Sequence, residues 1–268
     1  MTGTADQPPA VSVVIPVKDD DAALRRCLRA LALQTRQPDE VIVVDNGSTD
    51  VSAEVAREAG AHVLTCDRPG IPAASAMGYD AAHGDIVLRL DADCLPAGSW
   101  VQEMTDAFHA RPDVAAFTGG ARFIDGPPAL RTPLAIAYLL SYAAATVPAL
   151  GHLPVFGSNL GFRRTAWLDI RSAVHRDDAD VHDDLDLAFH LGERHRIRYL
   201  PGTRMGASMR PFAHARSFAR RVWRGIRTVV VHWPRDFPPV RWTRLGLRRV
   251  LHRLGVPTPR QRLGSGPA

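Results

Sequence analysis

The feature that most constrains the fold is a regular alternation of apolar, β-branched runs with helical patterns over residues 11–90. Four runs are typical of strands: Val11–Pro16, Glu40–Val44, Ala61–Thr65 and Ile86–Leu90. Between them, apolar residues recur at helical spacing, and Gly60 stands where the second helix should end. Strands that alternate with helices predict an α/β domain, in which a parallel sheet carries helices on its faces.

The turn after the first predicted strand counts against two common functions of such a domain. It reads PVKDDD and contains neither a Gly-x-Gly-x-x-Gly pattern nor a Walker lysine motif. Dinucleotide binding and P-loop chemistry both need glycine-rich turns at this point, because the backbone must approach the phosphates closely. The chain is therefore expected to use the carboxyl edge of its sheet for another ligand.

Two of the predicted strands end in carboxylates. Asp45 follows the second run, and Asp91 and Asp93 follow the run Ile86–Leu90, one residue apart. Open α/β sheets bind ligands beyond the carboxyl ends of their strands. Paired carboxylates supply hard oxygen ligands that suit Mg²⁺ or Mn²⁺ held jointly with substrate phosphates. The alternative is that these acids only cap the next helix or close the next turn.

The bulk composition is that of a globular protein, since 46% of the 268 residues are hydrophobic and 23% are charged. Three cysteines without a Cys-x-x-Cys pair predict reduced thiols in a cytoplasmic protein, not a disulfide framework or a cysteine-based zinc site. The first residues, MTGTADQPPA, lack the basic and apolar regions of a signal peptide, and residues 1–10 are predicted to be a disordered lead-in.

Positive charge is concentrated at the C-terminal end. From Arg204 onward the chain has 15 Arg and a single acid, Asp236. Arg residues interleaved with Trp233 and Trp242 suit an anionic membrane surface, which is kept as a candidate partner. Nothing resembles a nucleic-acid-binding module, so no nucleic-acid partner is predicted.

The second half of the chain shows weaker patterns. Val114–Thr118 and Ala121–Ile124 are predicted as two strands around a Gly-Gly pair. The Ala-rich segment Leu134–Leu150 is shorter than the roughly 20 residues of a membrane span and is predicted to be a buried or interfacial helix. Further on, Asp183 and Asp184 stand at the entrance of a helix with an apolar face.

Taken in order, these motifs resemble the family 2 glycosyltransferases, which have the GT-A fold and invert the sugar's anomeric configuration. The resemblance covers about Val11 to Pro201 and rests on the motifs IPVKDD, EVIVVDNGSTD, RLDADCLP, GSNLGFRR and HDDLDL. It implies a Rossmann-like, mostly parallel sheet with helices on both faces and an acceptor-binding subdomain. The expected divisions are a nucleotide-sugar-binding half (11–110), an acceptor-binding and catalytic half (111–203) and, from its composition, an Arg-rich segment (204–268) that forms a basic C-terminal helical tail.

The resemblance also implies roles for residues at the sheet edge. Asp45 and the loop after the first strand would bind the base and ribose of a nucleoside-diphosphate sugar, a UDP- or GDP-sugar. The residues of that loop are Pro16, Val17, Lys18 and Asp19. Asp93 would coordinate the divalent ion, Mn²⁺ or Mg²⁺, and Asp91 would lie near the ribose or the metal-bound water.

The catalytic base is assigned in the same way. An inverting transfer needs a base that takes the proton of the acceptor hydroxyl as its oxygen attacks the anomeric carbon. The family places an Asp at the position of Asp184. The alternative is helix capping, because an Asp is favourable in the first turn of any helix.

The chain departs from the family's pattern in one place. Where relatives often carry an Arg that steadies the diphosphate, this chain reads Ser75-Ala76-Met77. Lys18, Arg68 or a C-terminal Arg could substitute, and the segment Arg220–Gly225 faintly resembles the basic, Trp-containing segment of relatives. His214 could complete the metal's ligands, as a histidine does in some relatives.

The resemblance implies a hexosyltransferase-type enzyme that transfers sugar to an acceptor hydroxyl. Synthesis of cell-envelope or lipid-linked glycans on the cytoplasmic side, peripherally at the inner face of the cell membrane, is the setting considered. Two alternatives stay open at this point. A nucleotidyltransferase could share the sheet and the metal carboxylates, and a non-catalytic nucleotide-sugar-binding protein would keep Asp45 and Asp93 without using Asp184.

Overall fold

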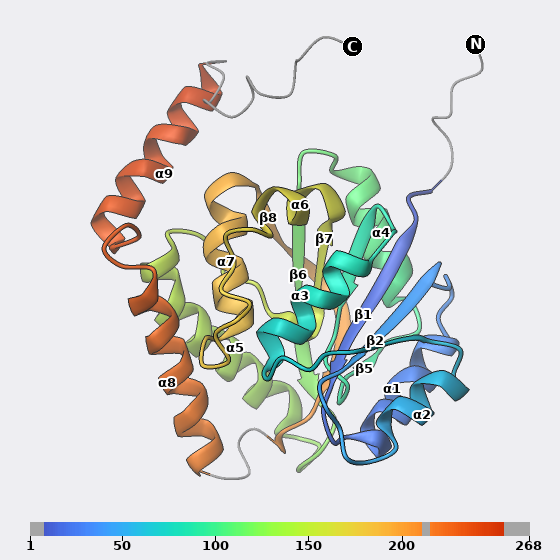
Figure 1. Cartoon of the computed structure of the whole chain (residues 1–268). Helices are drawn as coiled ribbons and strands as arrows, with labels where there is room; N and C mark the ends of the chain where they lie inside the picture. Colours follow the sequence, from blue (N-terminus) through green and yellow to red (C-terminus); the bar gives the residue numbers. More distant parts are fainter. Residues whose placement is uncertain (1–7, 211–214, 255–268) are drawn as a thin grey trace, which may run out of the picture.

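The computed structural model describes residues 8–210 and 215–254. Within these ranges a single sheet of eight strands runs through the molecule in the order β3-β2-β1-β4-β7-β6-β8-β5 (Figure 1). Its strands are β1 Val11–Val17, β2 Glu40–Asp45, β3 His62–Thr65, β4 Ile86–Arg89, β5 Leu95–Pro96, β6 Ala116–Phe123, β7 Leu160–Arg163 and β8 Ile197–Ala207. The helices are α1 Asp21–Ala32, α2 Ser52–Glu58, α3 Ile71–Ala81, α4 Trp100–Ala110, α5 Arg131–Leu150, α6 Arg164–Ile170, α7 Asp183–Arg194, α8 Ala215–Val231 and α9 Pro238–Arg253, with a 3-10 turn, η1, at Gly157–Asn159.

The first half of the sheet is parallel, as the alternating pattern predicts. Every residue of β1 is buried, and this strand pairs in parallel with both β2 and β4. The register places Val17 beside Asp45. Because parallel strands end at one edge, Asp45 and the residues after β4, including Asp91 and Asp93, emerge on the same side.

The second half of the sheet is mixed. Strand β7 pairs antiparallel with both β4 and β6, whereas β8 pairs in parallel with β6 and antiparallel with β5. The prediction of two strands around the Gly-Gly pair is wrong, because β6 is one strand whose register with β8 shifts between Gly119 and Ala121. A Cβ at Gly119 would overlap the side chains of Asn159 and Thr203, so glycine here lets those polar groups approach the strand. The glycines therefore mark a close approach, and the strand does not break.

Helices cover the sheet on both faces (Figure 1). One apolar layer lies between the sheet and helices α3, α6 and α7, with the rings of Tyr79 and Trp167 packed edge to face at 5.1 Å. The opposite layer lies beneath α1, α2 and α4 and includes the fully buried Trp100 and Phe108. These two cores fix the loops at the carboxyl edge from both sides.

Three helices extend the domain beyond this sandwich. Helix α5 packs against β6, α7 and α9, and α8 packs against α7 at the periphery (Figure 1). Helix α5 is longer than the Leu134–Leu150 segment expected from the sequence: its 20 residues are long and apolar enough to cross a membrane, and only 22% of its apolar window is buried. The expectation that the segment is too short for a span is therefore wrong. Arg241 of α9 is buried and donates to the carbonyl oxygens of Leu150 and Phe189 and to the carboxylate of Asp236. The Arg-rich segment is thus attached to the domain partly through its own arginines.

Candidate active site

The loops that follow β1 and β2 are joined by hydrogen bonds. Lys18 donates through Nζ to the carbonyl oxygens of Asn46, at 3.1 Å, and Gly47, at 3.3 Å. Asp19 adopts a positive φ of 49°, and its Oδ1 accepts from the backbone N–H of Thr49 at 2.6 Å. This hydrogen bond is the main reason that the pKa of Asp19 is lowered. The two loops form one preorganised rim at the end of β1.

Asp45 and Asn46 shape the same rim. Oδ1 of Asp45 accepts from the backbone N–H of Ser48 at 3.0 Å. This buried carboxylate therefore closes the turn, which is the alternative to ligand binding considered from the sequence. The side-chain amide of Asn46 donates to the carbonyl oxygen of Cys66, and its Oδ1 accepts from the N–H of Gly70. Asn46 therefore ties the loop after β2 to the loop after β3, a role that sequence reasoning missed.

Arg89 is the centre of the acidic cluster. Its side chain is 3% exposed, and its guanidinium contacts Asp91 at 2.9 Å, Asp183 at 3.1 Å and Asp184 in a shorter ion pair. It thus joins the end of β4 to the start of α7. The sequence interpretation counted Arg89 as part of an apolar strand and assigned it no role. The available signal was a charged residue inside an otherwise buried run.

Asp183 and Asp184 have opposite electrostatic environments. Burial raises the pKa of Asp183 to about 7. Burial would also raise the pKa of Asp184, but the adjacent Arg89 guanidinium and the backbone N–H of Gly157, which donates to Oδ2 at 2.8 Å, bring it below its usual value. A Cβ on Gly157 would overlap both the Arg89 guanidinium and the Asp184 carboxylate. The acid pair therefore depends on a glycine in η1.

Asp91 and Asp93 lie at the edge as predicted, each with a partner from the second half. Oδ2 of Asp91 accepts from Ser158 Oγ at 2.5 Å. Oδ2 of Asp93 accepts from Arg210 Nη2 at 3.0 Å, and Arg210 also pairs with Asp20. Burial, and next the charge of Asp91, raise the pKa of Asp93 above its usual value. The hydrogen bond from Arg210 lowers this pKa, but burial and the charge of Asp91 outweigh it.

These residues fit a hard divalent cation. Asp91, Asp93 and Cys94 carry ligand atoms within 4.8 Å of one another. Burial raises the pKa of the Cys94 thiol well above its usual value, so the thiol stays protonated and the available ligands are carboxylate oxygens. Such ligands suit Mg²⁺ or Mn²⁺. His214, the further ligand considered from the sequence, lies outside the described residues.

The basic residues considered from the sequence as contacts of a diphosphate have different partners in the structure. Arg68 pairs with Asp177 at 2.6 Å, and Lys18 is bound to backbone carbonyl oxygens. Arg221 of α8 donates to Tyr138 Oη at 3.2 Å. Burial would lower the pKa of Arg221, but Tyr138 and the more distant acids of the site raise it. Ser75, the first residue of the Ser75-Ala76-Met77 segment that lacks the arginine, donates to Oδ2 of Asp183 at 3.3 Å.

Sequence comparisons place this chain among known transferases. The model of the family described as "Glycosyl transferase family 2" matches residues 12–168. The chain is 35% identical over 102 residues to glycosyltransferase AglE of Haloferax volcanii, a match covering 35% of this chain and 34% of the relative. It is 41% identical over 93 residues to the undecaprenyl-phosphate 4-deoxy-4-formamido-L-arabinose transferase of Aeromonas hydrophila, covering 31% of this chain and 28% of that protein. Each match spans about a third of the curated relative.

Solved structures share the fold. Glucosyl-3-phosphoglycerate synthase from Mycobacterium tuberculosis in complex with Mg²⁺ and uridine diphosphate superimposes with a TM-score of 0.62 at 20% identity, covering 83% of this chain and 79% of that one. TarS of S. aureus gives a TM-score of 0.59 at 16% identity, covering 83% of this chain and 39% of that one. The expected GT-A architecture is confirmed by these neighbours.

Proposed function

Because the chain belongs to glycosyl transferase family 2 and is a glycosyltransferase, we propose that it moves a sugar from a nucleoside-diphosphate sugar to an acceptor hydroxyl with inversion. The observation that carries the proposal is the Arg89 cluster, which joins the edge acid Asp91 to Asp183 and Asp184. A donor-binding edge and a candidate base thus form one site. Membership of the family removes the support for the nucleotidyltransferase and for the non-catalytic binding protein.

The donor is proposed to bind against the joined loops after β1 and β2. The Asp45 carboxylate and the backbone of Pro16–Asp19 supply acceptors and donors for a base and a ribose. A UDP-sugar is the first donor to test and a GDP-sugar the second, because structural neighbours were crystallised with uridine diphosphate. Arg221 is proposed to contact the diphosphate in place of the missing arginine before Met77, because Asp91 and Asp184 of the site raise its pKa. Arg210, the other C-terminal candidate, already pairs with Asp20 and Asp93.

A divalent ion, Mn²⁺ or Mg²⁺, is proposed to be held by Asp93 together with Asp91. Such an ion would neutralise the charge that develops on the leaving diphosphate. Support comes from the carboxylates of Asp91 and Asp93, whose oxygens lie within 4.8 Å of each other, and from neighbours crystallised with Mn²⁺ or Mg²⁺. Arg210, which donates to Asp93, would compete with the cation for this carboxylate.

Asp184 is proposed to be the base. Its lowered pKa keeps it ionised at neutral pH, so it can accept the hydroxyl proton, although with reduced basicity. Arg89 and the Gly157 N–H hold the carboxylate in place. Asp183, one residue earlier, has the same side chain and a pKa of about 7, and it supplies a matched comparison.

The test compares Asp184→Asn with Asp183→Asn in sugar transfer from UDP-glucose, with Mn²⁺ and a panel of hydroxyl acceptors. Asp184→Asn should reduce kcat by about 10²–10⁴-fold, the usual contribution of a general base, while the affinity for the donor persists. Asp183→Asn should cost much less. If Asp184→Asn retains the wild-type rate, Asp184 only binds Arg89 and Gly157 and is not the base. If Asp183→Asn loses more activity, Asp183 is the base.

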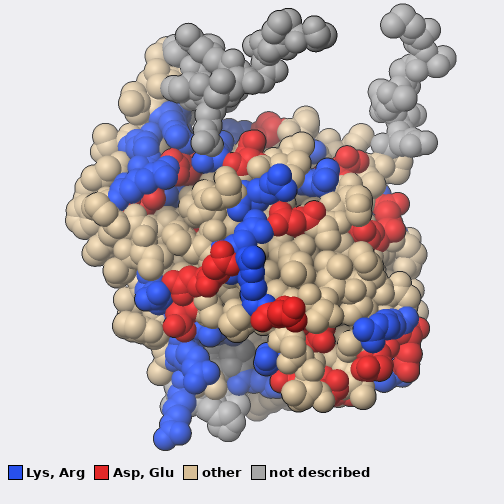
Figure 2. Space-filling model, viewed as in Figure 1, with Lys and Arg blue, Asp and Glu red and all other residues tan. Residues whose placement is uncertain are grey.

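A membrane surface is proposed as the place of action. The outer face of α8 exposes Val222, Trp223, Ile226 and Val230, and Trp223 is 59% exposed. Figure 2 shows basic side chains gathered over α9, beside a largely uncharged edge of the molecule. An apolar face next to Arg residues suits the interface of an anionic bilayer, where each basic residue contributes about 1 kcal/mol.

The acceptor is proposed to be lipid-linked, at the cytoplasmic face, because one relative is named as an undecaprenyl-phosphate sugar transferase. Flotation with anionic liposomes should retain the wild type and lose Trp223→Glu combined with Ile226→Glu. Leu33→Glu is the control, since Leu33 is 78% exposed just after α1. Equal flotation of all three proteins would contradict membrane docking through α8.

A further inference from the structure

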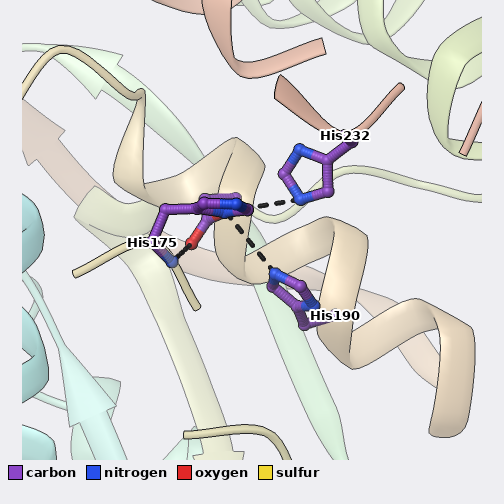
Figure 3. Close-up of side chains that lie close together, drawn as sticks. His175, His190 and His232 are labelled. Atoms are coloured by element: carbon purple, nitrogen blue, oxygen red, sulfur yellow. Dashed lines mark hydrogen bonds and ion pairs between the residues drawn. The ribbon is translucent and has the colours of Figure 1, made fainter. Parts of the chain in front are cut away.

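Three histidines and one aspartate gather on the side of α7 toward α8 (Figure 3). Asp186 and His190 lie one turn apart on α7, His175 comes from the segment after α6, and His232 follows the last residue of α8. Asp186 lies two residues beyond Asp184 and three beyond Asp183 on the same helix, but its carboxylate pairs with histidines, whereas Asp183 and Asp184 pair with Arg89. The two clusters are therefore distinguished by their partners.

The three imidazole rings converge on one carboxylate oxygen of Asp186. Oδ1 of Asp186 lies 2.6 Å from His175 Nδ1, 3.4 Å from His232 Nε2 and 3.6 Å from His190 Nε2. The four potential ligand atoms all lie within 4.8 Å of one another. Oδ2 of Asp186 accepts from the backbone N–H of His175 at 2.9 Å, which fixes the orientation of the carboxylate.

Two buried ring nitrogens of this cluster have no hydrogen-bond partner among the residues that the structure describes. They are Nε2 of His190 and Nε2 of His232, and both atoms are buried. The His232 side chain is 3% exposed, and its Nδ1 lies 2.7 Å from the carbonyl oxygen of Thr228, so Nδ1 carries the proton and donates it. In the neutral ring, the lone pair of Nε2 then faces the Asp186 carboxylate. Two lone pairs facing each other call for a cation between them.

We propose that His175, Asp186, His190 and His232 form a structural zinc site. Three imidazole nitrogens and one carboxylate oxygen are the kinds and the number of ligands that Zn²⁺ takes in closed tetrahedral sites. Tetrahedral ligands at about 2.0–2.1 Å from zinc stand roughly 3.3 Å apart, close to the separations of His232 and His190 from Asp186. The hydrogen bond that His232 Nδ1 donates to the carbonyl oxygen of Thr228 is the outer contact that typically orients a metal-bound imidazole.

The proposed ion would join α8 to α7. His232 stands at the end of α8, whereas Asp186 and His190 belong to the helix that begins with Asp183 and Asp184. With four protein ligands and no open position, the ion has a structural role and no part in sugar transfer. The carboxylates at the edge of β4 offer only oxygen and suit a different ion, so the two sites are distinguishable by metal preference.

The test uses the full chain, with Zn²⁺ alone as the probe. Zinc content after purification and Zn²⁺ titration against a chromogenic chelator should give one ion per chain in both the wild type and Asp93→Ala, because the second protein lacks a ligand of the edge site. His190→Gln and His232→Gln should each weaken Zn²⁺ binding at least tenfold. His109→Gln is the control, since His109 is exposed at the end of α4.

Folding is checked separately. The His190 side chain is 12% exposed, whereas the His232 ring stacks on Phe189 with a centroid separation of 4.0 Å. Replacing His190 therefore disturbs less packing than replacing His232. Zn²⁺ should raise the Tm of the wild type and of His109→Gln but leave the Tm of a folded His190→Gln unchanged. A wild type that neither contains zinc nor is stabilised by it, or equal Zn²⁺ affinity in all variants, overturns the proposal and leaves an imidazolium–carboxylate cluster.

Discussion

Replacing Arg89 by Met should reveal how much of the site's stability depends on one guanidinium. Arg89 contacts three carboxylates, and its own side chain is almost completely buried. Burial would lower the pKa of Arg89, but the charges of Asp183, Asp184 and Asp91 raise it well above its usual value. Methionine has a similar length and is apolar, so the substitution removes the charge without opening a large cavity.

The expected loss follows from leaving buried acids without their counter-ion. Removing one partner of a buried ion pair costs about 3–5 kcal/mol, and each kcal/mol lowers the Tm of a chain of this size by roughly 2–4 °C. Without the guanidinium, the folded-state pKa values of the acids rise above their unfolded values. Carboxyl groups with raised folded-state pKa values destabilise the folded protein increasingly as pH rises. The loss of stability in Arg89→Met, relative to wild type, should therefore be larger at pH 8 than at pH 5.

Thermal and urea unfolding of Arg89→Met and wild type at both pH values would measure this loss. Arg25→Met is the matched control, because Arg25 pairs with Glu58 on the surface, where the side chains are 44% and 66% exposed. An exposed pair contributes about 0–1 kcal/mol. A loss for Arg89→Met no larger than that of the control, or a loss independent of pH, would refute the electrostatic account of the cluster.

Three further predictions concern single residues of the site. Asp183→Asn should be more stable than wild type above pH 7, and this gain should vanish near pH 4. The reason is that burial raises the pKa of Asp183 from 3.8 to about 7, so the wild type loses stability as pH rises through that range. Measuring the Tm of both proteins against pH checks this. Gly157→Ala should displace Arg89 and Asp184, lower the free energy of unfolding by about 1–3 kcal/mol and reduce activity. Gly225→Ala is the control and should be neutral or stabilising, because a Cβ there meets nothing within 4 Å. Urea unfolding and transfer assays distinguish the two variants. Asp93→Ala should abolish transfer and the Mn²⁺ dependence of UDP binding, and calorimetry giving equal UDP affinity for wild type with Mn²⁺ and with EDTA would contradict the metal proposal.

The sequence alone determined the features that depend on neighbours along the chain. Periodicity predicted β1 to β4 and the helices between them, since a half-buried helix and a buried strand each require their own spacing of apolar residues. The rule that parallel strands end at one edge then placed Asp45, Asp91 and Asp93 together. The Gly-Gly pair in β6 misled the prediction because glycine serves both as a strand breaker and as a site of close approach.

Only the tertiary structure decided what these residues contact. Arg89 pairs with Asp184, which lies 95 residues further along the chain. Asn46 binds the loop after β3, 20 to 24 residues further along. No local pattern encodes either contact. The His175, Asp186, His190 and His232 cluster likewise joins three segments with irregular spacing. The physical reason is that charge pairing and metal ligation act over a few ångströms in space, whatever the separation in sequence, whereas periodicity reports only the burial of one element at a time.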